Sequence, residues 1–243
     1  MTQVISKKDL LSWLNQLTNE YRLIAPVSTE GLILFQQISR VEDIVLHFNN
    51  TVLSPKEWFF PTTETLFAVE RKDEQTELIS ASVDHKTVIF GLRPCDAKGI
   101  AVLDKAFLAE PTDTLYQQHR DKTTLIGLSC SQAGPECFCT SIGTAPNDPS
   151  HVDILLSEVE EGYVIQIVTR KGEALLSGVP VTESKVTLPP PPSLQAIPTE
   201  GIEEVMQEVF NAPYWSRLAD RCIHCNLCAY VCPTCYCFDI RDY

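Results

Sequence analysis

The spacing of apolar residues near the start of the chain predicts a helix followed by strands. Leu10, Leu14 and Leu17 recur at helical spacing after Ser6, a residue type that often caps helix N-termini, so residues 7–20 are expected to form an amphipathic packing helix. Three runs rich in β-forming residues follow, and each is expected to contribute a strand to the scaffold: residues 21–27, 31–38 and 41–48.

Residues 53–70 interrupt this regular pattern, because Pro55 and Pro61 disfavour a continuous strand or helix there. We expect an irregular segment whose aromatic residues pack on the core. Lys56 lies within it, and a solvated lysine is the expected interpretation, with contact to an anionic ligand as the alternative.

The middle of the chain has the pattern of strands followed by helices. Residues 87–92 form an apolar run typical of a buried strand, and apolar residues recur at helical spacing over residues 97–108. Residues 123–130 repeat the buried-strand pattern and end on Cys130, whereas Cys95 lies in the turn after the first strand. If the two strands are parallel, both cysteines lie at the carboxyl edge of the sheet, where open α/β sheets bind ligands.

The rest of the pattern divides the chain into two parts. Residues 152–169 alternate about a Glu-Glu-Gly turn and predict a β-hairpin. The proline run at 188–193 cannot join a sheet, so we expect a Pro-rich linker over residues 188–200. The predicted architecture is an α/β (or α+β) domain with a mixed sheet over residues 1–187, then a small helical, cysteine-rich segment over residues 201–243.

Composition narrows the range of partners and compartments. With 243 residues, 44% of them hydrophobic, the chain can bury one substantial core. A formal net charge of −13 makes nucleic acid and anionic membrane surfaces unfavourable partners. Charged residues interrupt any signal-peptide core, and no run approaches the roughly 20 apolar residues of a membrane helix. Together with ten cysteines, this predicts a reducing cytoplasm and metal binding.

The cysteines near the end of the chain carry the strongest chemical signal. Cys222, Cys225, Cys228 and Cys232 have the spacing C-x2-C-x2-C-x3-C followed by proline, the run by which bacterial ferredoxins bind 4Fe-4S clusters. A zinc ribbon usually separates its cysteine pairs by about 15 to 20 residues, and a disulfide framework needs an oxidising compartment. The sequence therefore predicts a ferredoxin-type iron–sulfur segment, with zinc ligands or buried structural thiols as alternatives.

Four other cysteines form a second candidate group. Cys137 and Cys139 lie in a Gly/Pro-containing loop after the strand that ends on Cys130, so they can approach the edge that also carries Cys95. Four thiols are the number that one cubane cluster needs. The spacing C-x6-C-x-C is not a general metal fingerprint, however, and free cysteines are often simply buried, so the residues alone leave both interpretations open.

Two cysteines lie outside both groups, and the chain lacks the common catalytic motifs. Cys235 and Cys237 are candidate ligands or neighbours of a cluster. We find no G-x-G-x-x-G loop, P-loop or nucleophile elbow, and the five histidines are scattered. Three functions remain: an electron-transfer subunit without catalytic residues of its own, a flavin-bearing reductase, and a zinc-stabilised assembly module.

Three stretches of the sequence together resemble a known family. RPCDA, CFC and CPTCYCFD are similar to signatures of the 4Fe-4S dicluster electron-transfer subunits, a family typified by the iron–sulfur subunit of anaerobic sulfite reductase and the beta subunit of cytoplasmic sulfhydrogenase. The resemblance covers most of the chain. It implies an anaerobic, cytoplasmic oxidoreductase complex in which such a protein relays electrons between a flavin subunit that meets NAD(P)H and a catalytic partner, either a siroheme reductase or a nickel–iron hydrogenase.

A more distant resemblance concerns the first cysteine group. The GLRPC turn and a downstream cysteine are similar to the beta subunit of deazaflavin-reducing hydrogenases, an α/β module that carries a cluster and a flavin. This similarity implies a 4Fe-4S cluster at Cys95, Cys130, Cys137 and Cys139. It also makes FAD a second candidate cofactor.

The family resemblance also bears on the C-terminal ligands. Its members continue into a second ferredoxin run, whereas this sequence stops at Tyr243, so we expect a fragment or a shortened relative. In a fragment, Cys232 would ligate a cluster whose other ligands are absent. In a shortened relative, Cys235 or Cys237 would complete one cube.

Overall fold

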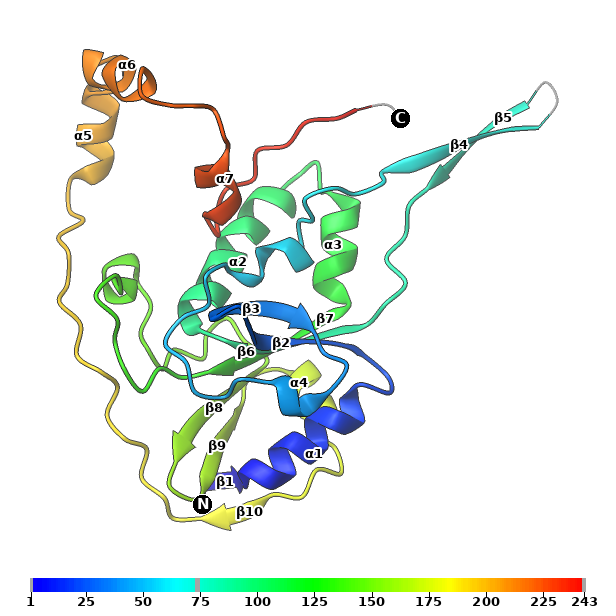
Figure 1. The fold of residues 1–243 in the computed structure, drawn as a ribbon, viewed down its shortest axis with the longest axis vertical. Coiled ribbons are helices and arrows are strands. Elements are labelled where there is room, and N and C mark those ends of the chain that lie inside the picture. Colours follow the sequence, from blue (N-terminus) through cyan, green and yellow to red (C-terminus); the bar gives the residue numbers. More distant parts are fainter. Residues whose placement is uncertain (1, 73–74, 242–243) are drawn as a thin grey trace.

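The computed structural model describes residues 2–72 and 75–241 and contains an eight-stranded mixed sheet covered by helices (Figure 1). The strands of this sheet are β1 (Thr2–Ile5), β2 (Arg22–Thr29), β3 (Leu32–Gln37), β6 (Thr87–Leu92), β7 (Thr123–Leu128), β8 (Ile154–Val159), β9 (Gly162–Ile167) and β10 (Thr182–Ser184). Their order is β10-β1-β9-β8-β7-β6-β2-β3. The four strands from β8 to β2 are parallel and the outer strands are antiparallel, which confirms the predicted α/β class and mixed sheet.

Helices cover both faces of the sheet. One face carries α1 (Lys7–Leu17) and α4 (Arg170–Leu175), and the other carries α2 (Pro94–Phe107) and α3 (Thr114–Asp121). Helix α1 begins after Ser6, whose Oγ accepts a hydrogen bond from the Asp9 backbone N–H at 3.1 Å, as the sequence pattern predicts. Leu10, Trp13 and Leu14 of this helix are buried against the sheet.

Strands β6 and β7 form the buried centre of the sheet. Every residue of both strands is buried, so the apolar runs at these positions predict them correctly. Because side chains alternate along a strand, Phe90 contributes to the core on the α1 face and Ile89 to the core on the α2 face. The two strands are parallel, with Ile89 paired to Leu125, so their carboxyl ends lie at the same edge.

A bulge at Gly91 precedes the turn that carries Cys95. The pairing of β6 with β7 shifts between Phe90 and Leu92, and Gly91 has φ +85°, a backbone conformation that favours glycine. A Cβ atom at this position would lie 2.9 Å from the Cδ atom of Pro26, so a larger residue would also clash.

The predictions for elements outside the centre of the sheet are less accurate. Residues 41–48 were expected to form a strand, but Val41–Asp43 form a 3-10 helix, η1, and Ile44 makes only an isolated bridge to Val27. Strands β4 (Phe67–Lys72) and β5 (Gln75–Ser80) were not predicted, and they pair with each other as a separate two-stranded sheet. Figure 1 shows this hairpin projecting away from the main sheet.

The C-terminal segment leaves the sheet at β10 and returns to it near α2 (Figure 1). Residues 185–199 form neither helix nor strand, as the proline run predicts. The helices of this segment are α5 (Ile202–Glu208), α6 (Pro213–Ala219) and α7 (Leu227–Val231). Across the described ranges, every helix is too short or too polar to cross a membrane.

Candidate metal centres

The structure brings Cys95 and Cys130 to the same edge of the sheet, as predicted. Cys95 is the second residue of α2, directly beyond β6, and Cys130 follows β7. The Cys130 backbone N–H donates to the Pro146 carbonyl oxygen at 2.8 Å, which fixes the start of the next loop. Both side chains are partly buried free thiols.

The loop after β7 adds the other two thiols of this group. The Gly134 backbone N–H and the Asn50 side-chain amide donate to Cys137 Sγ at 3.3 and 3.8 Å. Cys139 begins a short 3-10 helix, η3 (Cys139–Ile142), which ends at Gly143 in the left-handed conformation. The two cysteines thus enter the site from a loop that is folded back on itself.

The four thiols are close enough to influence one another. Burial, together with charge repulsion from Asp96, Cys130 and Cys139, raises the pKa of Cys95 to about 12. Burial also raises the pKa of Cys130 to about 11, with Cys139 and Cys137 adding to the shift. The pKa of Cys139 is raised by burial and then by Cys137. Each cysteine of the predicted group, Cys95, Cys130, Cys137 and Cys139, is therefore within electrostatic reach of at least one other.

Arg93, which the sequence analysis missed, supports this neighbourhood. Its side chain is only 5% exposed. The guanidinium donates to the carbonyl oxygens of Asn49 at 3.0 Å and Ser129 at 2.9 Å, and it also bonds the Phe48 carbonyl. Burial lowers the pKa of Arg93, and the nearby Cys130 counteracts that effect. Arg93 thus ties two neighbouring loops together and places a positive charge beside the thiols.

The second cysteine group lies on the C-terminal segment and is more exposed. Cys222, Cys225 and Cys228 are exposed, whereas Cys232 is partly buried. The His224 backbone N–H donates to Cys222 Sγ at 3.4 Å, an orientation suited to stabilising a bound sulfur ligand. His224, between Cys222 and Cys225, and Asn226, between Cys225 and Cys228, both have positive φ. The backbone therefore turns tightly between these cysteines.

Cys232 differs from the other cysteines of this group in its electrostatics. The Thr234 hydroxyl group, 3.4 Å from Cys232 Sγ, and the positive charge of Lys56 both lower the pKa of Cys232. The extra cysteines lie close to each other: a hydrogen bond with Cys235 raises the pKa of the exposed Cys237. Neither contact assigns Cys235 or Cys237 as a ligand.

Lys56 is not the solvated side chain that the sequence suggested. Its Nζ atom donates to the carbonyl oxygens of Ala229 at 3.0 Å, Cys232 at 2.8 Å and Cys235 at 3.3 Å. The prediction was wrong because these acceptors lie far along the chain, at the end of α7, where helical carbonyls have no partner within the helix. Lys56 therefore attaches the C-terminal cysteine-rich segment, residues 221–237 and called the ferredoxin-like segment from here on, to the α/β domain.

Packing along α2 reinforces this attachment. A Cβ atom on Gly99 would lie 3.1 Å from Pro233 Cβ, so the absence of a side chain lets the segment approach the helix. Further along, the Tyr236 ring packs edge-on to Phe107, with centroids 6.1 Å apart. Cys95 lies one helical turn before Gly99, about 6 Å along the axis. The same helix thus contacts both cysteine groups, and Figure 1 shows α7 beside α2.

The chemistry of the donors fits iron–sulfur centres. All ten cysteines, each within the described residues, are free, and backbone N–H groups point at sulfur atoms in both groups. Among residues 2–72 and 75–241, no three His, Cys, Asp or Glu side chains are arranged to hold a single metal ion.

Comparison with known proteins identifies the class of the C-terminal segment. Residues 218–234 match the model of the 4Fe-4S binding domain, the range that contains Cys222 to Cys232. The predicted iron–sulfur, electron-transfer class is therefore confirmed. The whole chain is similar to sulfhydrogenase 2 subunit beta of Pyrococcus furiosus, with 29% identity over 94% of this chain and 70% of that protein. This match confirms the predicted resemblance. No solved structure matches the chain.

Proposed function

We propose that this protein is the electron-transfer subunit of a multi-subunit oxidoreductase and carries two iron–sulfur centres. Cys222, Cys225, Cys228 and Cys232 contribute ligands to one centre. The other is held by the four thiols at the sheet edge: Cys95, Cys130, Cys137 and Cys139. A 4Fe-4S cluster, when bound, supplies reversible one-electron transfer at each position.

The single observation that carries this proposal is the placement of Cys95 and Cys130 at the same edge of the parallel strands β6 and β7, with Cys137 and Cys139 in the loop that follows. Cys95 and Cys130 follow the carboxyl ends of two parallel strands, and Cys137 and Cys139 come from one loop, so the site needs the folded sheet to exist. Arg93 supplies a fixed positive charge that offsets the negative charge of bound thiolates.

The arrangement of the two cysteine groups also suits a relay. Helix α2 carries Cys95 in its first turn and contacts Pro233, the neighbour of Cys232, at Gly99. An electron can therefore pass between the two positions through the packed interior of one protein. Lys56 and the aromatic contact between Tyr236 and Phe107 keep this spacing fixed.

The proposed partners follow from the similarity to a sulfhydrogenase subunit. One partner is a flavin subunit that exchanges electrons with NAD(P)H, and the other is a catalytic subunit of the nickel–iron hydrogenase or sulfite reductase type. The match to the 4Fe-4S binding domain favours this interpretation over a zinc-stabilised module. A cytoplasmic location accords with the ten free thiols.

Anaerobic metal analysis tests the proposal. Wild-type protein should contain about eight irons and eight acid-labile sulfides per chain, four of each per cluster. Cys95→Ser and Cys222→Ser should each lose about half of the iron, and the double variant nearly all of it. Ser129→Ala, a change beside Cys130, serves as the control and should retain the full content. Wild-type iron in Cys95→Ser would exclude the sheet-edge centre.

A further inference from the structure

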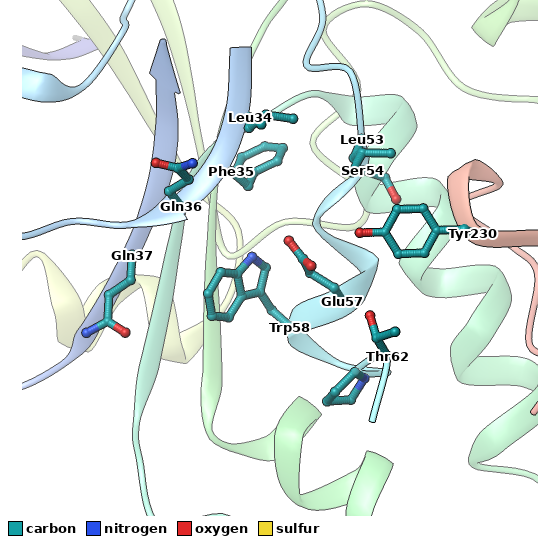
Figure 2. A pocket seen from close by; sticks show the side chains of 11 residues that line it. Leu34, Phe35, Gln36, Gln37, Leu53, Ser54, Glu57, Trp58, Thr62 and Tyr230 are labelled. Carbon is teal, nitrogen blue, oxygen red and sulfur yellow. The ribbon is translucent and has the colours of Figure 1, made fainter. Parts of the chain in front are cut away.

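A cavity of about 400 Å³ lies between the edge of the main sheet and the ferredoxin-like segment. Its walls come from β3, from the 3-10 helix η2 (Pro55–Trp58) and from Tyr230 of α7. Figure 2 shows Trp58, Phe35 and Tyr230 around this space, with the Glu57 carboxylate between the rings of Trp58 and Tyr230. Two neighbouring elements and one residue from the distant C-terminal segment therefore build one aromatic pocket with an acidic group inside it.

Within the part of the chain that the structure describes, Glu57 has no cation to pair with. Across residues 2–72 and 75–241, no hydrogen bond or ion pair involves its carboxylate, and no lysine or arginine lines the cavity. Burial raises the pKa of Glu57, as expected for a carboxyl group removed from water without a compensating charge. A partly buried carboxylate of this kind is stabilised most by a donor that brings positive charge.

The negative charge of the Glu57 carboxylate excludes several classes of ligand from the cavity. Phosphate groups of nucleotides and flavin nucleotides need basic side chains or a helix N-terminus, and a carboxylate repels them. The α-carboxylate of a free amino acid meets the same obstacle. The remaining polar lining consists of neutral amide and hydroxyl groups such as Gln36 and Ser54, which do not change this balance.

The aromatic walls favour one kind of cation. A guanidinium group is planar, stacks on aromatic rings and bonds a carboxylate with two parallel N–H donors, whereas an ammonium group does neither as well. Trp58 already accepts such a contact from outside the cavity: the Arg22 guanidinium lies 5.3 Å from the centroid of its ring. The chain as a whole carries a net charge of −13, so a basic partner surface is attracted to it.

We propose that this cavity is a docking site that receives an arginine side chain from a partner protein. The guanidinium would stack between Trp58 and Tyr230 and bond the carboxylate of Glu57. Tyr230 lies between Cys228 and Cys232, so a partner held here would rest beside the C-terminal cysteine group. The inference does not depend on the second iron–sulfur centre, because none of the described cysteines lines the cavity.

Binding of a capped arginine tests the proposal directly. The anaerobically purified protein is titrated with N-acetyl-arginine methylamide, and saturation-transfer NMR on the probe measures binding. The citrulline analogue, which has the same shape without the charge, is the matched probe. We expect saturable binding of the arginine probe, weakened about tenfold or more in Glu57→Gln, since a charge-assisted hydrogen bond is lost. Glu42→Gln, a change of an exposed carboxylate, should leave binding as in wild type.

Three results would overturn the proposal. Equal binding of the arginine and citrulline probes would show that charge is not recognised, and equal binding by wild type and Glu57→Gln would place the probe elsewhere. Tighter binding of free arginine than of the capped form would indicate a small-molecule site instead of a protein-docking site. Iron content, measured in the same samples, should not change in Glu57→Gln, so failure here is distinct from failure of the iron–sulfur assignment.

Discussion

The ammonium nitrogen of Lys56 lies 2.8 Å from the carbonyl oxygen of Cys232, although 176 residues separate them in the sequence. Two more carbonyl oxygens, from Ala229 and Cys235, accept hydrogen bonds from the same nitrogen. One cation thus satisfies three acceptors where α7 ends and the chain turns at Pro233. The position of the ferredoxin-like segment on the α/β domain depends on this contact.

Replacing Lys56 should release the C-terminal segment. Lys56→Met removes a charged donor shared by three carbonyl oxygens, of which that of Cys232 keeps a hydrogen bond from the Cys235 backbone N–H, so the attachment should weaken by about 1–3 kcal/mol. Amide hydrogen exchange over residues 227–237 should then accelerate, with little change in β6 and β7. Lys86→Met, at an exposed lysine of the same domain, provides the control. Unchanged exchange in Lys56→Met would show that this contact does not hold the segment.

Side chains of increasing size at Gly99 should show how much the attachment of the C-terminal segment depends on close packing, apart from the hydrogen bonds of Lys56. Alanine favours the helix by about 0.5–1 kcal/mol but places a methyl group 3.1 Å from Pro233 Cβ, so the two effects should nearly cancel. Leucine cannot fit and should displace the segment, exposing Arg221 to faster cleavage by trypsin. Trypsin should cleave wild type and Gly99→Ala at similar rates, and it should cleave Gly99→Leu faster than both. The same rate in all three proteins would contradict the close approach.

Arg93 should be important for the sheet-edge site. Arg93→Gln removes a buried charge that bonds the loops around residues 48–49 and 128–129, and the expected loss of stability is about 2–4 kcal/mol. Iron at the sheet-edge centre should fall, whereas the C-terminal centre should keep its share. Denaturant unfolding and iron analysis measure the two effects. Arg120→Gln, which breaks an ion pair elsewhere with Asp104, controls for a general loss of stability. Equal iron loss in both variants would remove any special role for Arg93.

Removal of iron should leave the main sheet folded. The cores on both faces of the sheet contain no cysteine within the described residues, so β6 and β7 do not need a metal for their burial. After treatment with an oxidant and a chelator, far-UV circular dichroism should change little. Exchange should increase mainly in the loop at residues 131–143 and in residues 221–237. Global unfolding on iron removal would show instead that the clusters hold the domain together.

The strands that position the site were predictable because their environment leaves a simple pattern. Residues 87–92 and 123–128 are buried on both sides and are apolar apart from the threonines at their starts. The C-terminal cysteine spacing was equally direct, because the ligands of one cluster lie close together in sequence. The hairpin of β4 and β5 left no such pattern, since the side chains of residues 67–71 and 75–80 are exposed.

The features that could not be predicted depend on contacts between residues that lie far apart in the sequence. The role of Lys56 depends on carbonyl groups of a distant segment, which carry no sequence signal of their own. Residues 41–48 were misassigned because the run is rich in β-forming residues, yet Val41 is buried from a 3-10 helix and Ile44 and Leu46 from the chain that follows it. Arg93 resembled an ordinary turn residue, and only the fold shows it between two loops.

Low-temperature EPR of the anaerobically reduced protein tests the central claim most directly. Wild type should give signals from two 4Fe-4S centres, Cys95→Ser should lose one of them, and Cys222→Ser should lose the other. A single signal in wild type that persists unchanged in Cys95→Ser would contradict the two-centre relay.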